Sequence, residues 1–388
     1  MNLVLYRKYR PKTFAEVVGQ GPIIQTLTNA IAKNMIGHGY LFSGSHGCGK
    51  TSVARLFAKS INCQNRKDGE FEPCNKCESC LEINQGNAID LIEIDAASNR
   101  GIDEMRELKE GIRFRPVKSK YKVFIIDEAH QLTKEAANAL LKTLEEPPAH
   151  AVFILATTEL HKMIPTIQSR CQQFSFRKLK LPELVGRLEH ILKQEKIKFE
   201  KAALEMIAQK ASGSVRDAET LLDQAISFSG CEPARNASQA GSRSDAGEGV
   251  LKTEIVQAIL GVADKTAIFN FLDFLQNKNA KSAFELLTEL RFSGVDLKEF
   301  VGDLIEHLRE ALFLKIDPNQ ESALVLVFTA EEKAKLLNLA QKYTEQELKN
   351  IIDLFMTAEN KMKYASIIQL PLELAVVDCC FGSNLNNK

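Results

Sequence analysis

The stretch Gly44-Ser45-His46-Gly47-Cys48-Gly49-Lys50-Thr51 decides the fold of this chain. It follows an apolar run that ends at Phe42 and precedes a helical pattern that starts with Ser52. Glycines at this spacing let backbone N–H groups wrap phosphates at the start of a helix, so we predict a phosphate loop over residues 44–52. We expect Lys50 to meet the β and γ phosphates of ATP, and the hydroxyl of Thr51 to hold Mg²⁺. The alternative is a glycine-rich turn without a ligand.

The acidic pair Asp127-Glu128 follows the apolar β-formers of residues 123–126. This position places both carboxylates at the carboxyl edge of a parallel sheet, where open α/β folds bind their ligands. Asp127 suits the Mg²⁺ shell, and Glu128 is the predicted general base that orients and deprotonates the attacking water. Either residue alone could instead be an acidic first turn that the helix dipole stabilises.

The pair Thr157-Thr158 ends the next apolar run, residues 152–156, so a polar side chain reaches the same edge of the predicted sheet. Thr158 is therefore the predicted sensor of the γ phosphate. An ordinary threonine at the end of a strand is the alternative.

Four of the nine cysteines have the spacing of metal ligands: Cys63, Cys74, Cys77 and Cys80. The short gaps let one tight turn aim neighbouring sulfurs at a single ion, and four thiolates predict a tetrahedral zinc site. Such a site has no open position for water, so we expect a structural role in closing the loop of residues 62–81. An iron–sulfur cluster and uncoordinated thiols are the alternatives, but nothing else in the chain indicates electron transfer.

The composition fits a globular chain of two or three domains, with 388 residues and 45% apolar content. The 50 basic and 50 acidic residues cancel, so any contact with nucleic acid needs a local patch. The amino terminus lacks the apolar core of a signal peptide, and no run of about 18 apolar residues occurs. We expect a cytoplasmic protein without membrane contact, whose remaining cysteines are unpaired.

Short apolar runs alternate with helical patterns from residue 40 to about residue 176, which predicts a parallel sheet covered by helices on both faces. Residues 183–228 are typical of three short helices, with turns near Lys198 and at residues 212–214. Residues 229–249 are rich in Ser, Gly and charge and predict a flexible tether. Helical periodicity then resumes. The expected strands are residues 39–43, 90–95, 122–126 and 151–156, and the clearest later helices cover 297–312 and 348–355, the latter behind the capping-box pattern of Thr344 and Glu347.

These motifs, in this order, resemble the ATPase subunits of bacterial DNA polymerase III clamp loaders, the gamma/tau family within the AAA+ ATPases. The likeness covers most of the chain, beginning with residues 5–14 and 17–20, which are similar to the adenine-side segment of that family. The resemblance implies an α/β AAA+ P-loop ATPase core with a zinc knuckle, a small helical lid and an all-α C-terminal collar. Further matching stretches are residues 93–98, 127–130, 139–148, 155–158, 169–171, 213–218 and 370–373.

The resemblance also implies roles that the sequence pattern alone leaves open. Arg170 would be the arginine finger that reaches the nucleotide of a neighbouring subunit, and Arg216 the second sensor, which contacts the γ phosphate from the lid. A planar guanidinium can brace charge spread over equatorial oxygens, and a finger supplied from outside makes hydrolysis depend on assembly. Without the family, Arg170 would be a surface salt-bridge residue and Arg216 ambiguous. The implied adenine-side residues are Tyr9, Arg10, Pro11 and Val18.

On the same basis we expect a core over residues 1–178 with the zinc-binding insertion at 62–81, a lid over 179–228, a linker over 229–250, a collar for oligomerisation over 251–380 and a tail over 381–388. In similar proteins the helix opened by Asn99, Arg100 and Arg106 faces a central channel, where basic groups and amides track phosphates without reading bases. A solvated helix face is the alternative for each. The tether is longer than the resemblance needs. The chain stops soon after Leu372, as in a short gamma form, a truncated tau or a lineage variant.

We therefore expect a Mg²⁺-dependent ATPase, without a polymerase active site of its own, that hydrolyses ATP at subunit interfaces to load a sliding clamp onto primer-template DNA. The expected partners are other clamp loader subunits in a pentameric ring, the clamp, and DNA held by its backbone. A non-catalytic structural subunit of the same assembly is the alternative, although the presence of Lys50, Thr51 and Glu128 argues against it. A DEAH-type helicase would need a second motor core, which the all-helical end does not supply.

Overall fold

The computed structural model describes residues 4–98, 111–112, 114–229, 250–260, 265–317 and 330–382. It divides into two compact units, Met1–Thr253 and Glu254–Lys388. The predicted DNA-side residues Asn99, Arg100 and Arg106, and the predicted tether beyond Ser229, lie outside the described residues.

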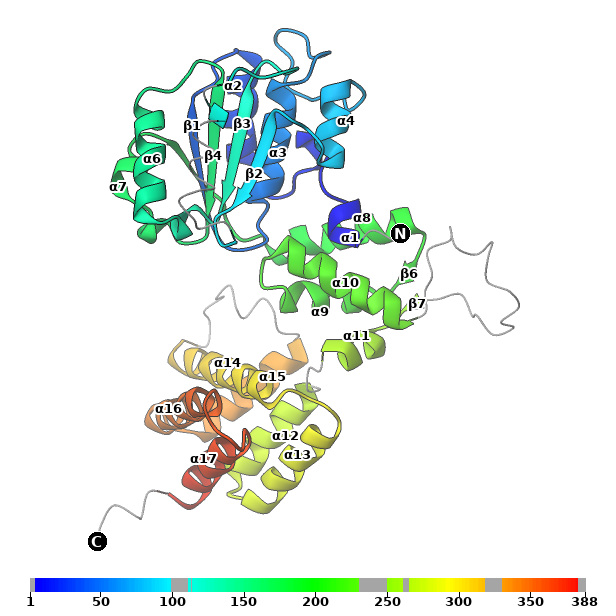
Figure 1. Ribbon diagram of the computed structural model, residues 1–388. Coiled ribbons are helices and arrows are strands. Elements are labelled where there is room, and N and C mark those ends of the chain that lie inside the picture. The colour runs from blue at the N-terminus through cyan, green and yellow to red at the C-terminus, as the bar shows by residue number, and fades with distance from the viewer. Residues whose placement is uncertain are drawn as a thin grey trace. The chain divides into compact units, whose positions relative to one another are not determined.

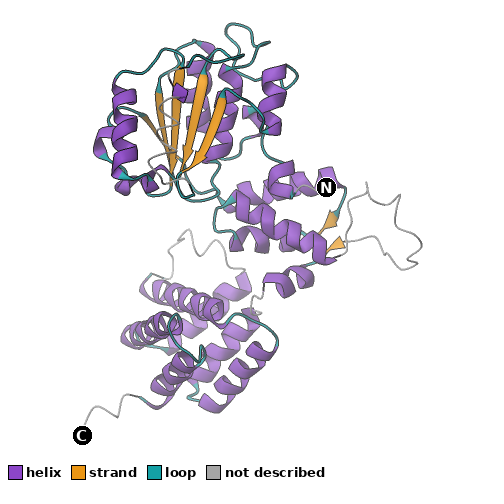
Figure 2. Ribbon diagram, in the orientation of Figure 1, coloured by secondary structure: helices purple, strands orange, loops and turns teal. Residues whose placement is uncertain are grey.

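The first unit is built on a parallel sheet, whose strands are orange in Figure 2. The strand order is β2-β3-β4-β1-β5. All four predicted strands are present. The fifth, at the β5 edge, was missed because its sequence Gln172-Gln173-Phe174-Ser175 buries only the phenylalanine. The strands are β1 (Gly39–Ser43), β2 (Leu91–Asp95), β3 (Lys122–Asp127), β4 (Ala151–Thr157) and β5 (Gln172–Ser175).

Helices cover both faces of this sheet, as predicted (Figure 1). Tyr40 and Phe42 of β1 pack with α2 and α3 on one face, and Leu41 packs with α6 and α7 on the other. Because both faces are covered, β1 and β4 are buried along their whole length, which explains their continuous apolar sequences. The helices around the sheet are η1 (Phe14–Glu16), α2 (Gly21–Ala32), α3 (Lys50–Ile61), α4 (Glu78–Gln85), η2 (Ala129–Gln131), α6 (Lys134–Glu145), η3 (Leu160–Lys162) and α7 (Pro165–Gln168). The first helix, α1 (Leu5–Lys8), instead contacts α10 (Val215–Ser229).

Three helices follow the sheet, as the sequence predicted: α8 (Leu181–Glu195), α9 (Lys201–Lys210) and α10 (Val215–Ser229). The first turn between them falls at Lys196, with φ 58°, and the second at Ser212 and Gly213, with φ 48° and 92°. The short strand β6 (Lys198–Phe199) then pairs in parallel with β7 (Val250–Leu251), which the sequence did not reveal.

The second unit is helical throughout its described residues, around one apolar core that includes Phe271, Phe300 and Phe355. The predicted capping box is present, because Glu347 N donates to Thr344 Oγ1 (3.2 Å) and Thr344 N donates to Glu347 Oε2 (2.8 Å). In the part of the chain that the structure describes, no helix is both long and apolar enough to cross a membrane. The helices are α11 (Thr253–Leu260), α12 (Lys265–Gln276), α13 (Ala280–Phe292), α14 (Leu297–Ile316), α15 (Ala330–Lys342), α16 (Glu345–Met362) and α17 (Leu370–Phe381).

Candidate functional site

The predicted phosphate loop connects the carboxyl end of β1 to Lys50, the first residue of α3. Gly44 has a φ of 149°, and a Cβ atom there would lie 2.5 Å from the carbonyl oxygen of Phe176, so a larger residue cannot fit. The first turn of α3 leaves N–H groups without helical partners beside this loop, which is the arrangement that binds phosphates.

The side chain of Lys50 folds back into the loop and is only 5% exposed. Its Nζ donates to the carbonyl oxygens of Gly44 (2.8 Å) and Ser45 (2.9 Å). Both acceptors are neutral, so these bonds hold the ammonium in place without cancelling its charge. An anion bound in the loop would therefore meet a positioned cation.

Cys48 contributes to the loop through its backbone, since its side chain is buried. The thiol donates to the carbonyl oxygen of Ser45 over 2.9 Å. Burial raises the pKa of this thiol above its ordinary value. Cys48 therefore stabilises the turn as a neutral donor.

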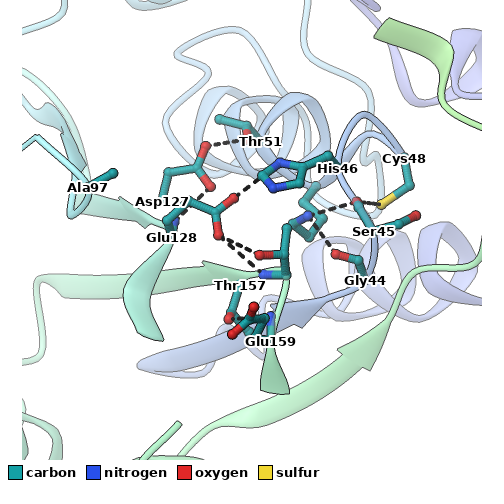
Figure 3. Close-up of polar contacts among 12 residues, drawn as sticks. Gly44, Ser45, His46, Cys48, Thr51, Ala97, Asp127, Glu128, Thr157 and Glu159 are labelled. Carbon is teal, nitrogen blue, oxygen red and sulfur yellow. Dashed lines mark hydrogen bonds and ion pairs between the residues drawn. The ribbon is translucent and has the colours of Figure 1, made fainter. Parts of the chain in front are cut away.

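Thr51 and Asp127 meet where the start of α3 approaches the end of β3. The Oγ1 hydroxyl of Thr51 donates to Oδ2 of Asp127 over 2.8 Å, as Figure 3 shows. Oδ1 of Asp127 accepts from the backbone N–H of Glu128 at 3.0 Å. A hydroxyl and a carboxylate side by side are the oxygen donors that Mg²⁺ prefers, so the residues present fit this ion.

Glu128 follows β3 in a left-handed conformation, with φ 47° and ψ 43°. Oε2 of its carboxylate accepts from the hydroxyl of Thr158 (2.8 Å) and lies 3.4 Å from Nδ1 of His130. Oε1 lies 3.5 Å from Nδ1 of the loop residue His46 (Figure 3). The predicted base and the predicted sensor are therefore in direct contact at the mouth of the phosphate loop.

The two threonines at the end of β4 have different surroundings. Thr157 is fully buried, and its hydroxyl pairs with Nδ1 of His130 at 3.0 Å. Thr158 is the one whose hydroxyl reaches Glu128. Sequence reasoning assigned no role to His130, although it stands two residues after Glu128 in the same motif.

The lid helices reach the phosphate loop through the start of α10. The backbone N–H of Val215 donates to the carbonyl oxygen of Gly47 at 3.0 Å. A Cβ atom on Gly47, where φ is 67°, would lie 2.0 Å from Oγ of Ser214 and 3.2 Å from Cβ of Arg216. The Cβ atom of Arg216 therefore lies beside the phosphate loop. The guanidinium at the end of this side chain lies 5.3 Å from the centre of the Tyr6 ring.

The N-terminal segment is held by the lid. Arg187 of α8 donates to the carbonyl oxygen of Tyr9, and Glu195 accepts from the side chains of Lys8 and Tyr9. Nε of Arg187 also lies 2.9 Å from Oε1 of Glu219 on α10, in a buried ion pair. Burial raises the pKa of Glu219, while the guanidinium opposes that shift. No motif marks Arg187, Glu195 and Glu219, because their partners lie far away in the sequence.

Arg10 and Val18, two more of the implied adenine-side residues, belong to the same N-terminal segment. Burial, and next the charge of Arg55, lower the pKa of Arg10. Val18 is partly buried and precedes Gln20, whose amide donates to the carbonyl oxygens of Cys48 (3.4 Å) and Arg177 (2.8 Å). Gln20 belongs to the matching residues 17–20 but has no role assigned from the sequence. Its two hydrogen bonds link this stretch to the phosphate loop and to the residues that precede the lid.

Arg170 lies at the amino ends of the strands, whereas the phosphate loop lies at their carboxyl ends. Its carbonyl oxygen would be 3.3 Å from a Cβ atom on Gly39, the first residue of β1, whereas the loop follows Ser43, the last. The four steps along the strand from Gly39 to Ser43 span about 13 Å. The guanidinium binds Glu145 (2.6 Å) and the Thr166 carbonyl (2.9 Å), so this chain does not bring Arg170 to its own loop.

The four predicted ligand cysteines come together, with all four sulfurs within 4.8 Å of one another. Four sulfurs bound to one Zn²⁺ at about 2.3 Å are separated by somewhat less than this, so the cluster fits a tetrahedral ion. The N–H groups of Cys77 (3.2 Å) and Lys76 (3.4 Å) point to Sγ of Cys74. Although burial acts against it, these N–H groups lower the pKa of Cys74 to about 6, which favours a thiolate.

A phosphate loop after β1, an acidic pair at the end of β3, two places along the same sheet, and a helical lid touching the loop define a P-loop ATPase core of the AAA+ class. Three family models match the chain. Residues 19–180 match DNA polymerase III, delta subunit; residues 183–231 match the ATPase lid domain of the DNA polymerase III clamp loader subunit; and residues 251–388 match domain III of DNA polymerase III subunits gamma and tau. The chain belongs to the gamma/tau family of DNA polymerase III subunits, which confirms the resemblance drawn from the motifs.

Curated relatives agree with this assignment. The tau subunit of Bacillus subtilis is 42% identical over 380 residues, 98% of this chain and 63% of the relative. The tau subunit of Escherichia coli K12 is 39% identical over 81% of this chain and 46% of its own length. The gamma subunit of Buchnera aphidicola from Acyrthosiphon pisum is 35% identical over 96% of this chain and 97% of its own. The chain thus spans about half to two thirds of these tau subunits.

Solved structures resemble the chain only distantly. The Bacillus subtilis clamp loader delta protein superimposes with a TM-score of 0.40 at 14% identity, over 92% of this chain and 99% of that one.

Proposed function

We propose that this chain is an ATP-hydrolysing subunit of a DNA polymerase III clamp loader. In this proposal the phosphates of ATP bind residues 44–52, where they replace the carbonyl partners of Lys50. The adenine side lies between the N-terminal segment, with Tyr9, Arg10, Pro11 and Val18, and the lid, from which Arg216 would reach the γ phosphate.

The chain's own residues supply the chemistry of hydrolysis. Thr51 and Asp127 would hold Mg²⁺, which neutralises charge between the β and γ phosphates when bound. Glu128 orients the attacking water and accepts its proton. In the structure this carboxylate accepts from Thr158. A γ phosphate that takes over the hydroxyl of Thr158 would release Glu128 for the water, so substrate binding would itself prepare the base.

The position of Arg170 carries the proposal that hydrolysis depends on assembly. The phosphate-loop residues Lys50 and Thr51 lie at the carboxyl ends of the strands together with Asp127, Glu128 and Thr158. Arg170 lies at the amino ends of the strands, beside Gly39. A cation that stabilises the transition state from this position must therefore act on the nucleotide of a neighbouring subunit.

We further propose that the partners are other clamp loader subunits in a pentameric ring, a sliding clamp, and primer-template DNA held through its backbone. Membership of the family of DNA polymerase III tau subunits supports this proposal. Asn99, Arg100 and Arg106 remain the proposed DNA-side residues, and Cys63, Cys74, Cys77 and Cys80 the proposed ligands of structural zinc.

Mixing two inactive variants tests the shared site. Lys50→Ala removes the phosphate lysine, and Arg170→Ala removes the finger, which is worth about 10³-fold or more in related ATPases. With partner subunits, clamp and primed DNA, each variant alone should show almost no ATP turnover. In an equal random mixture, about a quarter of adjacent pairs of this chain join an intact pocket to an intact finger, so up to about a quarter of the activity should return.

A matched control is Lys193→Ala, which removes another surface ion pair, that of Lys193 with Glu189 on α8. It should keep full turnover alone. If the mixture stays as inactive as its components while both variants assemble normally, Arg170 does not act on a neighbour's nucleotide. If the unmodified chain turns over ATP at the same rate with and without clamp and DNA, the clamp-loading function is wrong.

A further inference from the structure

The cysteine knuckle, residues 62–81, contacts the N-terminal segment, residues 9–18, through the carboxylate of Glu72. Its Oε2 accepts from the backbone N–H of Phe14 (3.0 Å) and its Oε1 from that of Ala15 (3.1 Å). These N–H groups belong to the first turn of η1, where they have no helical partner. Each bond involves an ionised acceptor and is therefore stronger than a neutral one. The rings of Phe14 and Phe71 add an apolar contact, with centroids 6.5 Å apart.

A second contact joins the knuckle, the segment and the phosphate-loop helix at one carbonyl group. The oxygen of Lys12 accepts from Nδ2 of Asn75 (3.1 Å) and from Nζ of Lys59 (2.9 Å). Lys59 belongs to α3, is 2% exposed, and also donates to Oδ1 of Asn75 (2.7 Å) and of Asn84 (2.9 Å). Burial lowers the pKa of Lys59, and three oxygen acceptors compensate its ammonium. The segment and the knuckle are therefore both fixed to the last turn of α3, the helix that begins at Lys50 of the phosphate loop.

The residues that make these contacts depend on the turn that presents the cysteines. Asn75 stands between Cys74 and Cys77 and has a φ of 56°, a left-handed conformation that few residues other than glycine and asparagine adopt. Glu72 precedes Cys74 by two residues. A metal ion bound by four thiolates fixes such a turn, because the ligands lose their freedom together. A metal ion bound by these thiolates would therefore hold both Glu72 and Asn75 in place.

From this geometry we infer that the metal-loaded knuckle braces the N-terminal segment in its nucleotide-binding position, with Glu72 and Asn75 as positioning residues for ATP. The inference rests on the proposed function, because it assumes that Tyr9, Arg10 and Pro11 border the nucleotide. It gives the knuckle a role beyond its own stability: zinc occupancy sets the affinity for ATP although no cysteine touches the nucleotide.

Two variants of the full chain test the brace. Glu72→Ala removes both carboxylate contacts, and Asn75→Gly removes the amide while keeping the left-handed turn relaxed. The measurements are zinc content, affinity for a fluorescent ATP analogue, and hydrogen exchange of the amides of residues 9–18. Both variants should keep zinc, bind the analogue about tenfold more weakly, and exchange faster at Phe14 and Ala15. Glu70→Ala is the matched control, because this knuckle carboxylate accepts from the backbone N–H of Lys67 (3.4 Å) within its own loop. It should change neither exchange nor affinity.

Zinc removal from the unmodified chain by a chelator should reproduce the faster exchange and the weaker binding. The inference is wrong if the variants keep the affinity of the unmodified chain, or if Glu70→Ala weakens binding equally. Should one variant lose zinc, the other decides. Failure of the unmodified chain to bind the ATP analogue would instead refute the proposed function, and the exchange measurement would still show whether the brace exists.

Discussion

The neighbours of the Glu128 carboxylate determine when this side chain can act as a base. Thr158 donates to it, and His46 and His130 lie within 3.5 Å. These contacts bring together residues from the phosphate loop, η2 and the end of β4. A single substitution here should change chemistry with little effect on binding.

Glu128→Gln keeps the size and the acceptor oxygen of the side chain but removes its basicity. We expect ATP turnover of the reconstituted assembly to fall at least about 100-fold, because general-base catalysis is worth at least that much. Affinity for the ATP analogue should stay within about twofold, since Lys50 and the loop are unchanged. Single-turnover kinetics with a parallel binding titration measure both quantities. Equal losses in binding and turnover would show that Glu128 holds the nucleotide instead.

Glu310 of α14 poses a different problem at the scale of a single residue. The residue is 3% exposed, and its two carboxylate oxygens have no hydrogen-bond partner among the described residues. Burial raises the pKa of this group. A raised folded-state pKa means that the contribution of Glu310 to stability is complete below about pH 4 and is lost as pH rises through the folded value.

Glu310→Gln should therefore stabilise the second unit at pH 8, by on the order of 1 kcal/mol, and have little effect near pH 4. Thermal unfolding of both chains across this pH range measures the difference. A gap in melting temperature that stays constant with pH would contradict the interpretation.

Among the secondary-structure elements of the first unit, alanine substitutions at two glycines should have opposite effects, one stabilising and one damaging. Gly186 lies inside α8, and a Cβ atom there would contact nothing within 4 Å. Gly186→Ala should stabilise the first unit by about 0.5–1 kcal/mol, because alanine restricts the unfolded chain and favours helix. Gly47→Ala should weaken ATP affinity strongly, since its Cβ would collide with Ser214 at the contact between loop and lid. Thermal unfolding and the analogue titration test the pair. Similar behaviour of both variants would show that the loop and lid do not pack as described.

The same elements show what the sequence could predict. Gly44 to Thr51 fixed β1 and α3, because few arrangements other than a strand, loop and helix satisfy that spacing. The knuckle followed from cysteine spacing alone. By contrast, β5 has two exposed glutamines, and the buried pair of Arg187 and Glu219 lies 32 residues apart, so neither leaves a local pattern. The roles of Arg170 and Arg216 came from the family resemblance and remain proposals. The boundaries predicted for the core, lid, linker, collar and tail are proposals as well.

At the scale of the whole molecule, the two units have separate apolar cores. We expect two transitions in calorimetric unfolding of the full chain. ATP at about 100 times its dissociation constant should stabilise the first unit alone, by about 2.7 kcal/mol. Glu310→Gln should shift only the transition of the second unit, so the effects of the ligand and of the substitution identify which calorimetric peak belongs to which unit. A single transition, or two that shift together with ATP, would show that the units unfold cooperatively.

The placement of Arg170 and the phosphate loop at opposite ends of the strands of one sheet has a consequence for counting. Each copy would present Arg170, the donor, on one side and its own nucleotide pocket, the receptor, on the other. Neighbouring copies would therefore associate head to tail in a heterologous contact. An open row of identical copies then always contains one fewer working catalytic centre than it has members, because the terminal receptor meets no donor. Turnover per copy should rise as the row lengthens and reach its full value only on closure.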